Sequence, residues 1–225
     1  MTIITTWTEG GWLSPLLAAA LGLGWGFAAD RLAARWPAHE DGSTRRIDWR
    51  TPLVVILGGL AFAATVARFG GEPRTLLIVG VYVSALVVLF ATDLDQRLLP
   101  DVITLPLIVL AAIVTFAGAS PFIHTNDEVL WAVAAAVVVP LALFLLAIPF
   151  GAGAIGQGDL KLLVSVGLLT GALNLFYGLV AGALLAGITV AILVFTRQIS
   201  MKSYVPYGPF LIVGILWAIL ALPQT

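Results

Sequence analysis

The chain consists mainly of long apolar segments separated by short polar ones. Eight segments are apolar on all sides and approach the about 20 residues that an α-helix needs to cross the hydrocarbon core of a membrane. They cover residues 11–29, 52–68, 75–92, 102–118, 129–149, 160–174, 176–195 and 208–222. The sixth is short and continues almost without a polar residue into the seventh. The pattern predicts an all-α fold, a polytopic transmembrane helical bundle of about eight helices, with residues 1–225 as a single integral-membrane domain.

The composition supports a membrane protein and removes several kinds of site. Of the 225 residues, 60% are hydrophobic and 10% are charged, whereas a soluble domain carries about 25% charged residues. Because the chain has no cysteine, it has no disulfide, no thiolate zinc site and no cysteine nucleophile. The formal net charge of −1 gives no bulk attraction to nucleic acid. Membrane lipid is the expected surrounding, and no cleaved signal peptide is expected because no basic region precedes the first apolar segment.

The positive charges predict the orientation in the membrane. With the N-terminus outside, nine lysines and arginines lie in one set of connections, and only Arg68 and Arg74 lie in the other. Lysine and arginine accumulate in cytoplasmic loops, so the first set is assigned to the cytoplasm. The count requires the sixth segment to cross by itself, since otherwise Arg197 and Lys202 would lie outside. His39 and His124 then lie on opposite sides, which excludes a metal site shared by the two.

Two acidic segments emerge on the same cytoplasmic side, because two spans separate them. Asp93 ends the third apolar segment, and Asp159 follows the glycine-rich "GAGAIGQG" at the start of the sixth. Ionisable groups near the membrane are costly, and those that persist are usually functional. Gly158 carries no side chain, so an extended peptide is expected to approach the Asp159 carboxylate closely.

Two carboxylates held close together have a chemistry of their own. They do not both ionise readily, so one keeps a proton while the other acts as a base. In aspartic proteases the base deprotonates a water that attacks the peptide carbonyl, and the protonated partner supports the oxyanion and the leaving amine. The acidic segments of this chain are candidates for such a pair.

The same residues resemble a known family. "GQGDLK" at 156–161 matches the G-x-G-D-x-K motif of the type IV prepilin peptidases, and "DLDQRLLPD" at 93–101 matches their second motif, an aspartate followed eight positions later by the aspartate of L-P-D. The segments at 21–37, 50–63 and 204–214 also resemble this family. The resemblance implies that Asp93 and Asp159 are the catalytic pair of a membrane aspartic endopeptidase.

The resemblance also implies a substrate and a location. Members of the family cleave the short basic leader peptide from precursors of prepilins and pseudopilins, at the cytoplasmic face of the bacterial inner membrane. They need no metal and no organic cofactor. Supporting or substrate-binding roles are expected for four further residues of the two motifs, namely Gly156, Gly158, Lys161 and Asp101.

The chain departs from the family pattern in two places. Many bacterial members carry two C-x-x-C pairs after the first helix and also methylate the new N-terminal amine with S-adenosylmethionine. Here the connection covers only residues 30–51 and has no cysteine. The second helix reads "TPLVVIL", where the family usually has a glutamate after the valine. The resemblance therefore favours a peptidase without methyltransferase activity.

Other residues of these segments have simpler interpretations. Asp95 and Asp101 are expected to be solvated or to cap a helix, with Asp101 as the N-cap of the fourth helix. Lys161 is expected either to orient Asp159 or to contact anionic lipid head groups. The arginines of the first cytoplasmic connection are expected to fix the topology. The small residues around 177–190 are expected to pack helices against each other.

Two other classes of function compete with the peptidase. An ion-coupled transporter also uses carboxylates on broken helices, but here no carboxylate lies deep in a span and no inverted repeat is evident. A non-catalytic membrane scaffold would account for the helices but not for two aspartate motifs on one side. The sequence leaves open which precursor is cleaved, and whether the protein works as a monomer or as a homo-oligomer.

Overall fold

The structure is a computed structural model that describes residues 13–38, 42–151, 155–198 and 207–222. These ranges contain seven α-helices and one short 3-10 helix, and no strand. The helices are α1 (Leu13–Ala33), α2 (Arg50–Phe69), α3 (Pro73–Gln96), α4 (Asp101–Phe116), α5 (Asn126–Ala147), η2 (Ile148–Phe150), α6 (Gln157–Phe195) and α7 (Gly208–Ala221). Helices α1, α2, α3, α5 and α6 are long and apolar enough to cross a membrane, whereas α4 and α7 are apolar but shorter. The prediction of a polytopic α-helical bundle is confirmed.

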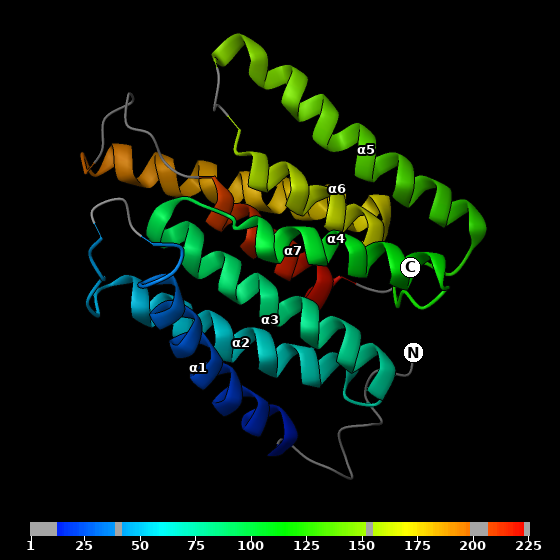
Figure 1. The fold of residues 1–225 in the computed structure, drawn as a ribbon, viewed down its shortest axis with the longest axis horizontal. Helices are drawn as coiled ribbons and strands as arrows, with labels where there is room; N and C mark the ends of the chain where they lie inside the picture. The colour runs from blue at the N-terminus through cyan, green and yellow to red at the C-terminus, as the bar shows by residue number, and fades with distance from the viewer. Residues whose placement is uncertain (1–12, 39–41, 152–154, 199–206, 223–225) are drawn as a thin grey trace. The chain divides into compact units, whose positions relative to one another are not determined.

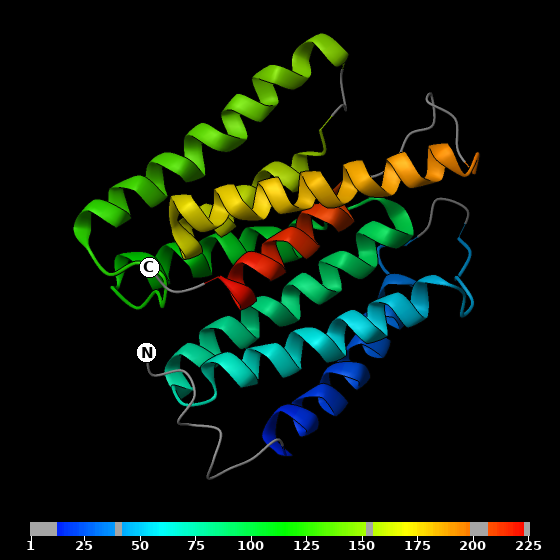
Figure 2. The same cartoon turned by 180° about the vertical axis from the view of Figure 1, so that it is seen from behind.

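The sixth and seventh predicted segments are two arms of one element, α6. Gly171 interrupts this element with φ 82° and ψ 174°, a conformation that residues with a side chain rarely adopt. The chain reverses there, and the two arms run back beside each other in both views (Figures 1 and 2). The break lies at Gly171 and not, as predicted, near residue 175.

The described helices belong to two compact units that divide between Gln96 and Arg97. In the first unit α1, α2 and α3 pack against one another. In the second unit α6 is central and contacts α4, α5 and α7. The two arms of α6 are the yellow and orange segments of Figure 1. The assignment of residues 1–225 to a single domain stays a prediction.

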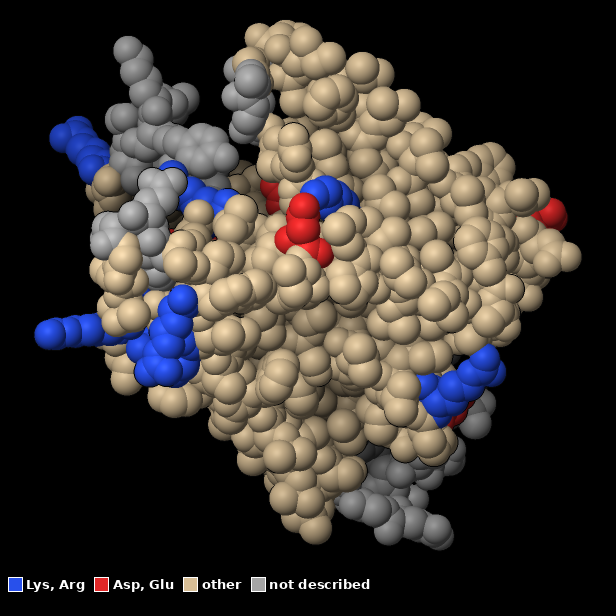
Figure 3. All heavy atoms as spheres, viewed as in Figure 1, with Lys and Arg blue, Asp and Glu red and all other residues tan. Residues whose placement is uncertain are grey.

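The described surface is strongly apolar. Large apolar side chains are exposed on every α-helix, among them Leu16, Leu60, Val102 and Phe195, which is 90% exposed. A soluble protein rarely shows apolar patches of this extent. On the face shown in Figure 3 the acidic and basic side chains are few, and most of the surface carries neither. This distribution fits a chain whose helices contact lipid.

Within each unit, glycines allow neighbouring helices to approach closely. A Cβ atom on Gly22 of α1 would lie 2.3 Å from the carbonyl oxygen of Gly58 in α2, and one on Gly58 would lie 2.4 Å from that of Gly22. In the second unit a Cβ atom on Gly214 of α7 would lie 2.3 Å from the carbonyl oxygen of Gly178 in α6. The packing role predicted for the small residues around 177–190 is confirmed at Gly178.

Alanine at Gly22 is expected to destabilise the first unit. The added methyl group meets backbone atoms that cannot rotate away, and such overpacking costs about 1–3 kcal/mol. Gly24→Ala is the matched control, because no atom lies within 4 Å of its Cβ position; it should stabilise by about 0.5–1 kcal/mol. Unfolding midpoints of both variants in detergent measure the difference. Equal midpoints would show that α1 and α2 do not cross at this glycine pair.

Candidate active site

Asp159 lies in the first turn of α6, at the start of the helix as the sequence predicts. Its carboxylate hydrogen-bonds the backbone N–H of Gly156, the N-cap residue. The free amides of a helix N-terminus favour a negative charge at this place. The second carboxylate oxygen, Oδ1, is buried and has no hydrogen-bond partner among the described residues. Asp159 therefore carries one oxygen held by the backbone and one that is available to a water or a substrate.

The two glycines beside Asp159 are in close contact with other groups. A Cβ atom on Gly156 would lie 3.0 Å from Asp159 Oδ2. A Cβ atom on Gly158 would lie 2.6 Å from the Cβ of Leu99 and 3.1 Å from its carbonyl oxygen. The sequence predicts that a substrate approaches Gly158 closely. In the structure Leu99, which belongs to the chain's own L-P-D motif, makes a close approach to Gly158. The approach of a substrate backbone to Asp159 at this position stays a prediction.

Asp101 and Lys161 form an ion pair in the second unit. Lys161 Nζ donates a hydrogen bond to Asp101 Oδ1 at 2.6 Å, with both side chains partly exposed. Lys161 therefore pairs with Asp101 rather than with Asp159. Asp101 is the first residue of α4 and Pro100 is the N-cap, so the prediction of Asp101 as N-cap is wrong by one residue. An exposed pair of this kind stabilises little by itself, about 0–1 kcal/mol.

The L-P-D end of one sequence motif thus meets the G-x-G-D motif in the second unit. The L-P-D motif contacts the first turn of α6 through Leu99 against Gly158 and through Asp101 against Lys161. The residues of the ion pair are 60 positions apart in the chain. The sequence indicated only that both segments lie on one side of the membrane, whereas the structure brings them into contact.

Asp93 lies in the last turn of α3, which continues to Gln96. Its exposed fraction is 6%. The helix end predicted at Asp93 is therefore three residues later, and Asp95 belongs to the helix rather than to a connection. Asp93 is part of the first unit and Asp159 part of the second, so their pairing stays a prediction.

Asp95 is not solvated, and that prediction is wrong. Its side chain is only 1% exposed, and its Oδ1 lies 2.6 Å from Arg45 Nε and 3.0 Å from Arg50 NH1. Arg45 also contacts Asp30 and Asp48. Burial alone would lower the pKa of Arg45, but the hydrogen bond to Asp30 and the charges of Asp30, Asp95 and Asp48 raise it above its ordinary value. Arg45 and Arg50 therefore bind carboxylates within the first unit, and their part in fixing the topology stays a prediction.

Two residues near the motifs were not identified from the sequence. Asp30, at the end of α1, is fully buried and accepts hydrogen bonds from Arg31, Arg45 and Thr51. A carboxylate at the end of an apolar segment is the signal that could have identified it. Tyr207, the N-cap of α7, donates a hydrogen bond to the Leu179 carbonyl at 3.3 Å.

The negative charge of Asp159 also acts on Tyr207. Burial, together with the negative charge of Asp159, raises the pKa of Tyr207 to about 12. Residues 204–206, which precede Tyr207 in the "YVPYGPF" segment, lie outside the described residues.

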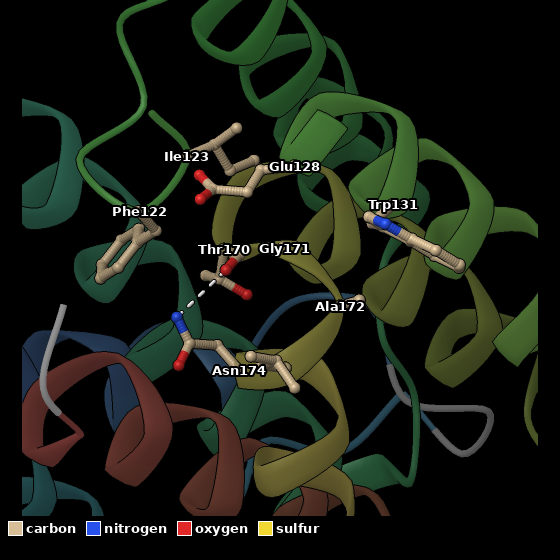
Figure 4. Close-up of a pocket in the computed structure, with 9 residues that line it drawn as sticks. Phe122, Ile123, Glu128, Trp131, Thr170, Gly171, Ala172 and Asn174 are labelled. Carbon is tan, nitrogen blue, oxygen red and sulfur yellow. Dashed lines mark hydrogen bonds between the residues drawn. The ribbon is translucent and has the colours of Figure 1, made fainter. Parts of the chain in front are cut away.

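A cavity of about 360 Å³ lies beside the reversal of α6 (Figure 4). Its polar lining comes from Glu128, Thr170 and Asn174, and Asn174 Nδ2 donates a hydrogen bond to the Thr170 carbonyl at 3.0 Å. Its apolar lining includes Phe122 and Trp131. The residues of the two motifs are not among those that line it, so this cavity is separate from the candidate site.

The described residues contain no group of three or more His, Asp or Glu side chains that could hold a metal ion. His39 lies outside the described residues. The expectation of a site without metal or organic cofactor stays a prediction, and the groups at hand for chemistry are carboxylates.

Comparison with known proteins agrees with the motifs. Residues 80–195 match the model of the type IV leader peptidase family. A protein of Dickeya chrysanthemi named prepilin leader peptidase/N-methyltransferase is 35% identical over 75% of this chain and 58% of its own length. Proteins of the same name from Pseudomonas putida and Burkholderia pseudomallei are 30% and 31% identical over 77% and 73% of this chain. The chain spans 52–60% of the length of these three relatives. No solved structure shows significant similarity.

Proposed function

Because the chain belongs to the type IV leader peptidase family, we propose that it is a membrane aspartic endopeptidase. Its substrate is the precursor of a type IV prepilin or pseudopilin, from which it removes the basic leader peptide. Cleavage takes place at the cytoplasmic face of the bacterial inner membrane. Asp93 and Asp159 are the catalytic carboxylates.

The observation that carries this proposal is the contact between the two family motifs in the second unit. The L-P-D motif packs on the first turn of α6, which holds Asp159 with one buried oxygen that no described residue hydrogen-bonds. A membrane scaffold has no need for such an oxygen. Unpaired buried carboxylate oxygens are costly, and they persist where a ligand or a reaction uses them.

The reaction needs two carboxylates in different protonation states. The ionised one removes a proton from a water whose oxygen forms a bond to the carbonyl carbon of the scissile peptide. The protonated one donates a hydrogen bond to the developing oxyanion. When the C–N bond breaks, a proton passes to the leaving amine, and the products are a free leader and a new N-terminus.

The proposal covers the peptidase activity alone. The relatives named above carry N-methyltransferase in their names, but the connection between α1 and α2 in this chain is short and has no cysteine. We therefore expect cleaved products with an unmethylated N-terminus. The precursor and the membrane lipid are the partners, and both a monomer and a homo-oligomer are compatible with the reaction.

Cleavage by the purified protein tests the proposal directly. The protein is reconstituted in lipid vesicles and incubated with several prepilins, and the products are identified by mass spectrometry. We expect one cut in each precursor, between its basic leader and the apolar segment that follows. A pilin that lacks the leader should not be cut. If none of the precursors is cleaved and cations cross the membrane of the same vesicles, the peptidase proposal is overturned in favour of an ion-coupled transporter.

A further inference from the structure

Six charged side chains of the first unit form one connected group, called here the loop cluster. It joins the end of α1, the connection to α2, the start of α2 and the last turn of α3. Its members are Asp30, Arg31, Arg45, Asp48, Arg50 and Asp95. Three acidic and three basic residues balance one another, so the group carries no formal net charge.

Arg45 is the centre of the loop cluster. One of its nitrogens contacts Asp30, a second lies 2.6 Å from Asp48 Oδ1, and a third lies 2.6 Å from Asp95 Oδ1. The planar guanidinium group can serve three carboxylates at once, which a lysine cannot do. The side chains of Arg45, Asp30 and Asp95 are 11%, 0% and 1% exposed. Charges that only mark the cytoplasmic side need no such burial, as the exposed Arg35 and Arg46 illustrate.

The cluster reaches the turn of α3 that carries Asp93. Asp95, two residues after Asp93, is held by Arg45 and Arg50. Gln96, the next residue, donates hydrogen bonds to the carbonyl oxygens of Pro37 at 2.7 Å and Ala33 at 3.4 Å. The end of a helix normally frays because its last turn lacks partners. Here the last turn is bound to the connection between α1 and α2 on two successive residues.

We propose that the loop cluster positions Asp93 for the reaction, with Arg45 and Asp95 as positioning residues. This inference rests on the proposed function, since Asp93 is the group that is positioned. In this proposal the connection between α1 and α2 contributes to the peptidase reaction by holding the turn that carries Asp93. Residues that fix a reacting group matter because a displacement of about 1 Å can cost about 100-fold in rate.

The reactivity of a thiol at position 93 measures how exposed this turn is, and the measurement does not depend on cleavage of a substrate. The chain has no cysteine, so Asp93→Cys introduces a single thiol at a place that is 6% exposed. We expect slow modification by a water-soluble maleimide, and a rate about tenfold higher when Arg45→Gln is added, because the turn opens. Arg46→Gln is the matched control, because it makes the same change at the neighbouring residue, whose side chain is exposed.

Cleavage of a prepilin gives the second readout. In the chain with Asp93 intact, Arg45→Gln should lower kcat by about 100-fold, while KM and the helix content stay close to the original. Arg45→Lys keeps the charge and should recover part of this loss, whereas Arg46→Gln should cleave normally. If Arg45→Gln fails to fold, Asp95→Asn takes its place, since it releases the last turn of α3 but leaves the contact between Asp30 and Arg45.

The outcomes separate this inference from the proposed function. Faster modification with Arg45→Gln and unchanged modification with Arg46→Gln show that the cluster holds the turn of Asp93, even if the protein cleaves no prepilin and the peptidase proposal fails; the positioning role for the reaction also requires the loss of kcat. Equal modification rates in folded variants overturn the positioning role, even if the original protein cleaves well. A lower unfolding midpoint with unchanged kcat and unchanged modification also overturns it, because the cluster would then only stabilise the fold.

Discussion

Replacing either Asp93 or Asp159 by asparagine is expected to lower prepilin cleavage by about 1,000-fold, within the 10²–10⁴-fold range of general acid and base catalysis. Asparagine has nearly the shape of aspartate but neither takes up nor releases a proton. Since one carboxylate must be ionised and the other protonated, the loss of either should stop the same step. The double variant should therefore be no slower than the worse of the two single ones.

The measurement needs a control for folding and for charge. Asp127→Asn makes the same chemical change at an exposed residue in the first turn of α5, and it should cleave at the original rate. Single-turnover rates in vesicles, with helix content and unfolding midpoint measured on the same samples, complete the comparison. Cleavage that survives either Asp93→Asn or Asp159→Asn at matched folding would exclude a mechanism with two aspartates.

Alanine at Gly158 is expected to have the second-largest effect. Its methyl group would lie 2.6 Å from the Cβ of Leu99, closer than such atoms can approach, and 3.1 Å from the carbonyl oxygen of Leu99, which is a tight contact. Because these atoms belong to the backbone or adjoin it, the L-P-D motif must move away from the first turn of α6. Such overpacking costs about 1–3 kcal/mol, and the accompanying shift beside Asp159 should lower kcat by about 100-fold.

Gly187→Ala, in the second arm of α6, is the matched control for this variant. No atom lies within 4 Å of the Cβ position of Gly187, so alanine there should leave cleavage unchanged and stabilise the helix by about 0.5–1 kcal/mol. Adding Leu99→Ala to Gly158→Ala should not restore activity, because alanine keeps the Cβ atom that clashes. If Gly158→Ala cleaves as well as Gly187→Ala, the contact between the two motifs has no part in catalysis.

The helices were predictable because crossing a membrane requires long apolar runs, and the polar residues between these runs mark the ends. Asp159 at a helix start was predictable for a similar reason, since glycines before it end regular helix. The partners of the charged residues were not. Asp95 was expected in solvent because short acidic side chains usually are, yet it is buried against arginines that are 45 and 50 residues before it in the chain. Periodicity contains no information on such pairs.

The reversal at Gly171 was predicted about four residues too late, between the segments 160–174 and 176–195. A positive φ is a property of one residue, and α6 contains several glycines that could have adopted it. A Cβ atom on Gly167, Gly178 or Gly182 would meet close neighbours, so these glycines allow helices to pack closely and do not break α6. The sequence around a glycine does not distinguish these two uses.

The place of this reversal also sets the depth of the carboxylate in the bilayer. From Asp159 to Thr170 the first arm of α6 rises by about 17 Å, at 1.5 Å per residue, whereas the hydrocarbon core is about 30 Å thick. In the predicted topology the reversal lies toward the outer boundary of the membrane. Asp159 then lies well below the level of the cytoplasmic head groups, unless the bilayer is thin at this protein. For the proposed peptidase we then expect water and substrate to enter the membrane to reach Asp159, and the rate of cleavage to depend on the lengths of the lipid chains.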